Sequence, residues 1–298
     1  MFSVICRRVT ALVLALSLFL ALPGAAMSPP MDYMTDVYAL PIDFTGGYEP
    51  LASGFISRTE YEDPTIHVRV ESGRYQECDY WLARIKIASP TQLRTVSAGG
   101  FNTGMTMTGT SLAKRVNAVL AVDGDYYFYT GKGYILRQGV LYQNILDGST
   151  DVLLIDEEGD FHVVRYAVQG SVTPEINGKK VINAMYFGPA LVIDGEPVRE
   201  ATGHNMAQDM GRQRMCIAQV GPLEYMCICC AGPARGSNGM TLPTWVEFVS
   251  SFGVKTAYNL DGGDSTMLIF NFEKVNDVNN NSSRKISDII YFASAWDE

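Results

Sequence analysis

Short apolar runs, each ended by turn residues, are the feature that most restricts the fold of this chain. AVLAV, DVLLID, YMCICCA and DIIYF are typical of these runs, and YWLARIKIA alternates its side chains with a period of two. Runs of this length that are rich in β-branched and aromatic residues predict strands. Because helical patterns are rare beside them, we predict an α+β fold, a single domain with a mixed, mostly antiparallel β-sheet core and a few flanking helices.

Two segments carry helical signals. GTSLAKRVN predicts a short helix that Thr110 or Ser111 would cap. TLPTWVEFVSSFG predicts a longer helix, in which Thr241 caps the N-terminus, Pro243 suits the first turn and Gly253 ends the helix. Its apolar residues recur at helical spacing, so one face of this helix should pack against the core.

The N-terminus has the order of segments typical of a secretory signal. Two arginines precede an apolar run that Pro23 and Gly24 break, and small residues follow. We therefore predict a signal peptide at residues 1–26, a linker or N-terminal arm at 27–50 and the main domain at 51–298, with a secreted or extracytoplasmic location in the cell envelope. An uncleaved signal anchor is the alternative, and it would be the only link to a membrane.

Acidic residues outnumber basic ones, and the formal charge is −9 at pH 7. The sequence contains no basic run longer than two residues. A surface of that sign repels phosphate backbones, so we expect no nucleic-acid partner.

Five cysteines follow the predicted signal peptide, and this odd number argues against a full disulfide framework. In YMCICCAG, strand geometry would place Cys227 and Cys229 on one face and Cys230 on the other. Small buried hydrophobic residues are the favoured interpretation. A metal site is the weaker alternative, because no Cys-x-x-Cys pair or nearby histidine supports it. A disulfide, for example between Cys216 and one of these three, stays open.

Polar residues gather at the ends of apolar runs in four places. Asp123-Gly124-Asp125 follows AVLAV, and on an extended backbone its two carboxylates would share a face. Arg137 lies at a predicted hairpin turn. Arg214 precedes an apolar strand, where its planar guanidinium can hold a phosphate or carboxylate. Each of these three patterns alone is more often a turn or a surface residue.

The fourth place, AYNLDGGDSTMLIF, carries the most polar chemistry. Asp261-Gly262-Gly263-Asp264 is followed by Ser265 and a threonine. The glycines permit positive φ and close backbone approach, and successive N–H groups of such a turn can hold an anion. A two-residue hairpin turn needs fewer polar groups than this, so we predict a binding or catalytic site here.

A series of motifs in this order resembles the phosphodiester glycosidase family, particularly its secreted bacterial members associated with exopolysaccharide. They are AVDGDYYF, GYILRQGVLYQN, FGPALVIDGEPV, RMCIAQVGP, GMTLPTWVEF, NLDGGDS and RKISDIIYF. The family includes the N-acetylglucosamine-1-phosphodiester α-N-acetylglucosaminidases. The resemblance implies a hydrolase that cleaves a sugar-1-phosphodiester in envelope or exopolysaccharide glycans. The chain departs from the family at Asp123, where asparagine is usual, and at Gln213, where proline is common.

That chemistry predicts roles for the candidate residues. Phosphate leaves with little need of a strong acid, so one carboxylate with cationic clamps would suffice. We expect Asp261 to act at the sugar as base or nucleophile, and a structural turn carboxylate is the alternative. The other predicted site residues are Asp123 and Asp125, for sugar hydroxyls or a second carboxylate role; Arg137 and Arg214, for the phosphate; and Gly262, Gly263 and Ser265, for the pocket wall.

The partner that we expect is a carbohydrate or sugar phosphate. No cofactor is certain, but a divalent cation such as Ca²⁺ would suit the hard oxygens of Asp123, Asp125, Asp261 and Asp264. The alternative function is a non-catalytic glycan-binding module on the same scaffold, in which the aromatic run at 126–129 would stack on sugars. Ser/His/Asp hydrolysis is disfavoured, because the chain has three histidines and no Gly-x-Ser-x-Gly nucleophile elbow.

Overall fold

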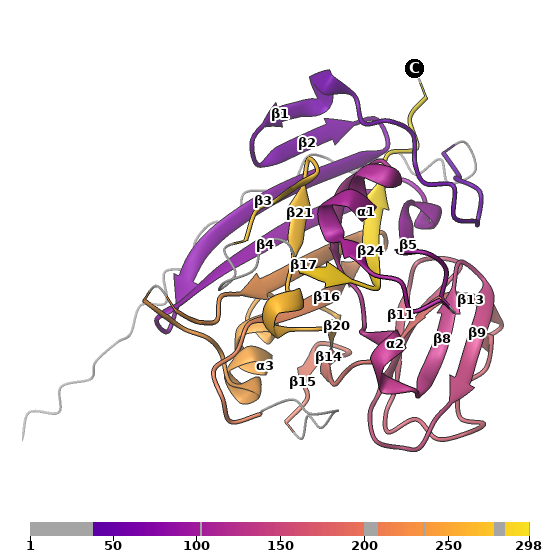
Figure 1. Cartoon of the computed structure of the whole chain (residues 1–298), viewed down its shortest axis with the longest axis vertical. Coiled ribbons are helices and arrows are strands. Elements are labelled where there is room, and N and C mark those ends of the chain that lie inside the picture. The colour runs from indigo at the N-terminus through magenta and orange to yellow at the C-terminus, as the bar shows by residue number, and fades with distance from the viewer. Residues whose placement is uncertain (1–37, 102, 200–207, 235, 277–283, 298) are drawn as a thin grey trace, which may run out of the picture. The chain divides into compact units, whose positions relative to one another are not determined.

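The computed structural model describes residues 38–297 apart from residues 102, 200–207, 235 and 277–283. The predicted signal peptide and the first part of the predicted arm lie outside these residues. Within them the chain is predominantly β, and every strand pairing is antiparallel (Figure 1). The mostly antiparallel character is therefore confirmed, whereas the strands form several sheets instead of one core sheet.

The largest sheet has nine strands in the order β1-β2-β3-β4-β17-β16-β20-β14-β15. They are β1 (Phe55–Ser57), β2 (Glu60–Asp63), β3 (Ile66–Tyr75), β4 (Cys78–Ile87), β17 (Glu224–Cys230), β16 (Arg214–Gly221), β20 (Thr256–Asn259), β14 (Ala190–Ile193) and β15 (Glu196–Pro197). Cys216 is opposite Asn259 in the register of β16 and β20. The turn after β20 therefore lies beside the start of β16.

A second sheet has five strands in the order β22-β21-β7-β24-β5. They are β22 (Glu273–Lys274), β21 (Leu268–Phe270), β7 (Ala118–Asp123), β24 (Asp288–Ala293) and β5 (Leu93–Ser97). Every residue of β7 and β24 is buried. Both faces of these strands are covered, which explains why their sequences are apolar without alternation.

The remaining strands form one further sheet and two small pairs. The further sheet contains β11 (Phe161–Val164), β10 (Val152–Asp156), β13 (Lys179–Met185), β8 (Gly133–Arg137), β9 (Val140–Ile145) and β12 (Glu175–Ile176). The pairs are β18 (Pro233–Ala234) with β19 (Ser237–Asn238), and β23 (Lys285–Ile286) with β6 (Met107–Thr108). Short 3₁₀ turns span Ala52–Gly54, Pro90–Gln92 and Gly263–Ser265.

Three helices accompany the sheets in the described part of the chain: α1 (Gly109–Arg115), α2 (Tyr127–Thr130) and α3 (Leu242–Ser250). Helix α3 is capped by Thr241, whose hydroxyl accepts the N–H of Thr244, and this confirms the prediction. Helix α1 instead begins at Gly109 and is capped by Thr108. The predicted cap at Thr110 or Ser111 was wrong, because the extended backbone at Thr108 lets its hydroxyl reach the first turn.

Side chains of the nine-stranded and five-stranded sheets meet in the main hydrophobic cluster, and each of these two sheets carries a helix on its other face. In β7, Leu120 and Val122 belong to the main cluster, whereas Ala121 packs in the cluster of α1. Trp245 of α3 is fully buried in a cluster on the outer face of the nine-stranded sheet. The order of layers is thus α3, large sheet, five-stranded sheet, α1.

The cysteines follow the predicted alternation. Cys227 and Cys229 belong to the main cluster, whereas Cys230 faces the cluster of α3. All five cysteines of the described residues are buried and free, so none of them forms the disulfide that the sequence left open.

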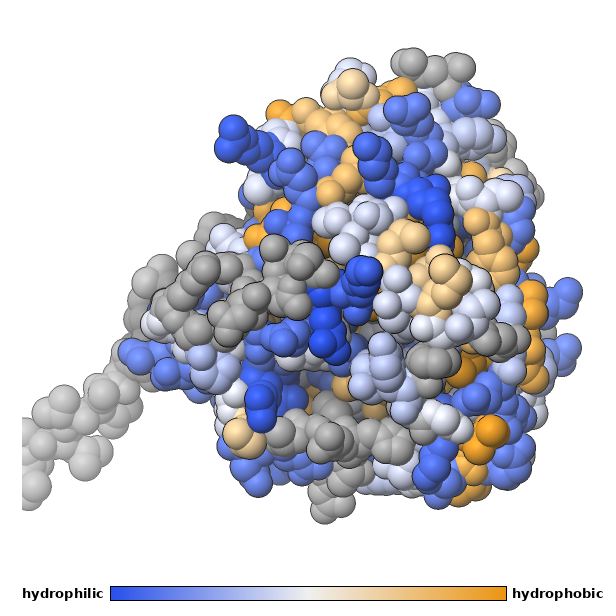
Figure 2. Space-filling model, in the orientation of Figure 1, coloured by the Kyte–Doolittle hydropathy of each residue, from blue (hydrophilic) through white to orange (hydrophobic). Residues whose placement is uncertain are grey.

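The described residues contain no helix that is long and apolar enough to cross a membrane. On the face drawn in Figure 2, hydrophobic residues are scattered among hydrophilic ones instead of forming one continuous patch. The large apolar surfaces of the strands are therefore buried between the layers.

Candidate active site

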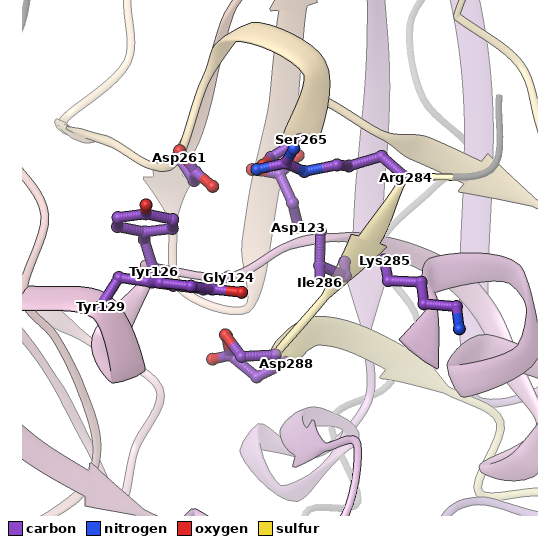
Figure 3. A pocket seen from close by; sticks show the side chains of 11 residues that line it. Asp123, Gly124, Tyr126, Tyr129, Asp261, Ser265, Arg284, Lys285, Ile286 and Asp288 are labelled. Carbon is purple, nitrogen blue, oxygen red and sulfur yellow. The ribbon is translucent and has the colours of Figure 1, made fainter. Parts of the chain in front are cut away.

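A pocket lies where the ends of β7 and β24 meet the turn after β20 (Figure 3). It is lined by Asp123, Gly124, Tyr126, Tyr129, Asp261, Ser265, Arg284, Lys285, Ile286, Ser287 and Asp288. Asp123, Asp261 and Ser265 are among the residues that the sequence predicts for the site. The predicted residues outside this lining are Asp125, Arg137, Arg214, Gly262, Gly263 and Asp264.

The backbone of Gly124 joins segments that are far apart in the sequence. Its N–H donates to the carbonyl oxygen of Asp288 over 3.2 Å, and its own carbonyl oxygen accepts the N–H of Asp261 over 3.1 Å. In the register of β7 and β24, Asp123 is opposite Ile289, so Asp288 comes level with Gly124. Carboxyl groups from three strand ends therefore line one pocket.

Position 124 has no room for a side chain. A Cβ atom there would lie 2.4 Å from Cγ and Oδ2 of Asp288, closer than non-bonded carbon and oxygen atoms can approach. The Asp288 carboxylate is held from the other side by the hydroxyl of Ser287, which donates to Oδ1 over 3.0 Å. The glycine thus lets Asp288 face the pocket.

Asp261 begins a tight turn and is the least buried of the three pocket carboxyl groups. Its Oδ1 accepts the N–H of Gly262 over 2.7 Å. Burial raises the pKa of Asp261 to about 6, against the opposing effects of the Ser265 hydroxyl, the Gly262 N–H and the positive charge of Arg284. Most of this carboxyl group is therefore ionised at neutral pH, the form that a base or nucleophile requires.

The other two pocket carboxyl groups, those of Asp123 and Asp288, are fully buried. Burial is the main cause, and the negative charge of Asp261 the second, of a pKa of Asp123 that is raised well above its usual range. Burial, followed by the charge of Asp125, raises the pKa of Asp288 to about 7. The pocket therefore holds carboxyl groups that titrate in different pH ranges, an arrangement that lets one act as an acid while another is a base.

Arg137 ends β8 at the predicted hairpin turn, but its side chain is fully buried. Its Nη2 lies 2.8 Å from Oδ1 of Asp125 and 3.6 Å from Oδ2 of Asp288. Asp125 also accepts the N–H of Tyr186 through Oδ2 over 2.7 Å. The sequence suggested a phosphate contact for Arg137, but its guanidinium pairs with buried carboxylates, and neither Arg137 nor Asp125 is in the pocket lining.

Arg214 begins β16 and is also buried. Its Nε donates to the carbonyl oxygen of Met240 over 2.7 Å, and Nη2 donates to that of Met210 over 3.3 Å. The bond to Met240 ties the start of β16 to the segment that precedes α3. Two backbone carbonyl groups are thus among the partners of this guanidinium, and the phosphate contact expected for Arg214 stays a prediction.

Gly262 and Gly263 pack against the backbone before β16. A Cβ atom at Gly262 would lie 2.8 Å from the carbonyl oxygen of Gln213, which also accepts the N–H of Gly263 over 3.1 Å. Gly263 has φ of +60°, a conformation that glycine adopts readily. Close approach to Gln213 therefore explains the glycine at position 262, and the positive φ explains the glycine at position 263. Asp264 beside them is exposed.

Two pocket residues, Arg284 and Asp288, were missed by the sequence analysis as individual candidates. Figure 3 shows that Arg284 extends towards Ser265 and Asp261, whereas the neighbouring Lys285 points away. Arg284 brings positive charge to the carboxylates, because it lowers the pKa of Asp261. The signal for both residues was the polar stretch RKISD directly before an apolar strand.

Tyr126 and Tyr129 form an aromatic pair in the pocket wall. Their ring centroids are 4.3 Å apart at an interplanar angle of 16°, and Tyr129 is 51% exposed. Tyr127 is buried and packs on Phe101. An exposed aromatic ring beside carboxylates suits the apolar face of a sugar.

No group of three or more His, Cys, Asp or Glu side chains in the described ranges is arranged to hold a metal ion. The four candidate carboxyl groups, those of Asp123, Asp125, Asp261 and Asp264, are therefore not gathered into such a group within these ranges.

The family model for phosphodiester glycosidases matches residues 116–293, which contain all the lining residues of the pocket. The chain belongs to the phosphodiester glycosidase family. Among curated proteins, none matches the sequence of this family member.

Solved structures support the fold of this phosphodiester glycosidase family member. The catalytic domain of a zebrafish N-acetylglucosamine-1-phosphodiester alpha-N-acetylglucosaminidase, auto-inhibited by pro-peptide, aligns with a TM-score of 0.63 at 15% identity, over 83% of this chain and 87% of that chain. A hypothetical protein from Synechocystis aligns with a TM-score of 0.51 at 15% identity, over 76% of this chain and 62% of its own. At this identity the likeness concerns the fold alone.

Proposed function

We propose that this protein is a hydrolase that cleaves sugar-1-phosphodiesters. The observation that carries the proposal is a pocket, in a phosphodiester glycosidase fold, where the ionised Asp261 faces the cationic side chain of Arg284. A sugar-1-phosphodiester presents the two complements of this pair, an electrophilic anomeric carbon and an anionic phosphate.

In this proposal Asp261 acts at the anomeric carbon as base or nucleophile, and Arg284 holds the phosphate as it leaves. A guanidinium pairs well with phosphate because two of its N–H groups can donate in parallel. Arg284 takes the part that the sequence suggested for Arg137 and Arg214, since those two side chains already bond to buried carboxylates and to backbone carbonyl groups.

The expected sugar is N-acetylglucosamine, because the zebrafish relative is named for its action on an N-acetylglucosamine-1-phosphodiester. The natural substrate would be an envelope or exopolysaccharide glycan, in keeping with the signal-like N-terminus and an extracytoplasmic location.

The decisive assay compares two synthetic compounds, the methyl phosphodiester of α-N-acetylglucosamine 1-phosphate and p-nitrophenyl α-N-acetylglucosaminide. We expect hydrolysis of the first in strong preference to the second. Arg284→Met should lower kcat/KM for the phosphodiester by about 10- to 100-fold, because it removes a charged hydrogen-bond donor to the phosphate. Arg58→Met is the matched control, since that arginine is exposed and lies outside the pocket lining, and it should change kcat/KM little.

A glycan-binding module without activity is the second candidate, and the stacked pair of Tyr126 and Tyr129 favours it. Saturable binding of the phosphodiester with no release of sugar by the wild-type protein would support this candidate and refute hydrolysis.

A further inference from the structure

The two carboxyl oxygens of Asp123 differ in their hydrogen bonding. It is the last residue of β7 and is fully buried. Its Oδ1 accepts the N–H of Met267 over 2.7 Å. Its Oδ2 is buried without a hydrogen-bond partner among the described residues, and the residue lines the pocket. Such an atom is costly to leave unsatisfied, so it points to a ligand that completes it.

The neighbours of Asp123 are mainly acids. Asp261 approaches from the turn after β20 and Asp288 from β24, and both disfavour a negative charge on Asp123. The thiols of Cys227 and Cys229 on β17 lie near enough for Asp123 to raise their pKa. The turn after β20, the start of β24 and strand β17 therefore present acids or neutral thiols to this carboxyl group, and Arg284 lines the same pocket from the segment before β23.

Neither Arg137 nor Arg284 forms an ion pair with Asp123 in the described part of the chain. The buried guanidinium of Arg137 pairs with Asp125 and Asp288. Arg284, which precedes β23, exerts its charge on Asp261. No ion pair within the described residues includes Asp123, so an ionised Asp123 would be a buried charge without compensation, which proteins avoid.

We propose that Asp123 is a neutral carboxylic acid that donates a hydrogen bond from Oδ2 to a phosphate oxygen of the bound sugar phosphodiester. The catalytic part of this inference rests on the proposed function. A neutral donor at this position attracts the phosphate, whereas an ionised carboxylate would repel it. Asp123 is therefore a ligand of the substrate and not a second base or nucleophile.

Asp123→Asn and Asp123→Leu separate these two possibilities. Asparagine has nearly the same shape, keeps an acceptor for Met267 and offers an amide donor to the pocket, whereas leucine offers none. On the methyl phosphodiester we expect kcat/KM to fall less than about tenfold in Asp123→Asn but about 30-fold or more in Asp123→Leu, the loss of a hydrogen bond to a charged group. An Asp123→Asn variant as inactive as Asp123→Leu would overturn the proposal, because it would show that an ionised carboxylate is needed.

A second readout does not depend on hydrolysis. Unfolded aspartate ionises near pH 3.9, and the folded protein keeps Asp123 protonated at higher pH, so wild-type stability falls as pH rises between these two pKa values. Asp123→Asn lacks this loss. Its thermal midpoint should therefore exceed that of the wild type by a margin that grows from about pH 5 to about pH 8.

A constant margin across this pH range would overturn the neutral form of Asp123. If the wild type hydrolysed no phosphodiester but the margin grew, the proposed function would fail and the protonation of Asp123 would stand. If Asp123→Asn did not fold, the carboxyl ¹³C signals of labelled Asp288→Asn protein would decide, because the pKa of Asp288 is itself raised to about 7 and its removal leaves Asp123 as the buried aspartate that should keep its protonated shift at neutral pH. A set of carboxyl signals that had all shifted to ionised positions by pH 7 would refute it.

Discussion

Two turns in this protein have the same sequence pattern, an apolar strand with Asp-Gly and a second acid after it, yet the structure treats them in opposite ways. The first turn, residues 123–125, buries both of its carboxyl groups completely. The second turn, residues 261–264, leaves Asp261 partly exposed and Asp264 exposed. The two turns are bonded to each other through the carbonyl oxygen of Gly124.

The difference arises in the chain segments on the C-terminal side of the two turns. After Asp125 the chain continues into α2 and β8, and β8 returns Arg137 to pair with Asp125. After Asp261 the positive φ of Gly263 directs the chain outward through an exposed residue before it re-enters β21. The same Asp-Gly pattern can therefore bury its carboxyl groups in one turn and expose a reactive carboxyl group in another. The residues that distant strands bring to each turn determine the outcome.

The largest expected effect concerns Asp261 in the second, more exposed turn. Asp261→Asn should lower kcat for the methyl phosphodiester by about 10³-fold, because it removes the base or nucleophile. Asp264→Asn, in the same turn, should change kcat less than about threefold since that side chain is exposed outside the pocket lining. Equal activity of Asp261→Asn and wild type would show that Asp261 is only a structural carboxylate of its turn.

The second-largest expected effect concerns the first turn, whose carboxyl groups are buried. Asp125→Asn should lower the free energy of unfolding by about 3 kcal/mol, because Arg137 would lose its nearest buried counter-charge. Denaturant titration measures this change, and Asp264→Asn, expected within about 0.5 kcal/mol of wild type, is the control. A loss below about 1 kcal/mol for Asp125→Asn would mean that Asp288 alone compensates the guanidinium.

The contact between the turns can be tested at Gly124. Gly124→Ala should cost about 1–3 kcal/mol of unfolding free energy, since its Cβ would collide with the carboxylate of Asp288. Gly221→Ala is a matched control, because a Cβ atom there meets nothing closer than Oε2 of Glu224 at 3.8 Å. Equal thermal midpoints for the two variants would contradict the tight packing at Gly124.

The smallest effect is the pH dependence. Since a base or nucleophile must be ionised and the pKa of Asp261 is raised to about 6, kcat/KM should fall as pH drops through this value, by about tenfold per pH unit below it. Asp288→Asn should keep this acidic limb, which separates Asp261 from the second titrating carboxyl group. A profile that stays level from about pH 7 to about pH 5 would exclude Asp261 as the titrating group.

Local signals predicted much of the fold. Helix α3 and its cap were found because the cap, the apolar stripe and the final glycine lie within one short segment. The opposite orientation of Cys229 and Cys230 followed from strand alternation alone. The division into several sheets was missed, because it depends on which distant strands pair, and their runs look alike in the sequence.

The candidate site, like the fold, was predictable from local signals but not where it depends on the pairing of distant strands. Asp123 and Asp261 stood out because glycines and acids follow their strands, and both line the pocket. Asp288 and Arg284 reach the pocket only through the register of β24 with β7 and the pairing of β23 with β6. The burial of Arg137 was equally hidden, since a guanidinium at a hairpin end is buried only if carboxylates from elsewhere meet it.

Chemical modification of the five buried thiols can also report unfolding. Each is at most 1% exposed and free, so an alkylating reagent cannot reach any of them until the layers separate. They lie on β4, β16 and β17, the central strands of the largest sheet. Mass spectrometry after a short exposure to iodoacetamide would therefore distinguish molecules with no added groups from fully modified ones, and would report the opening of this sheet molecule by molecule.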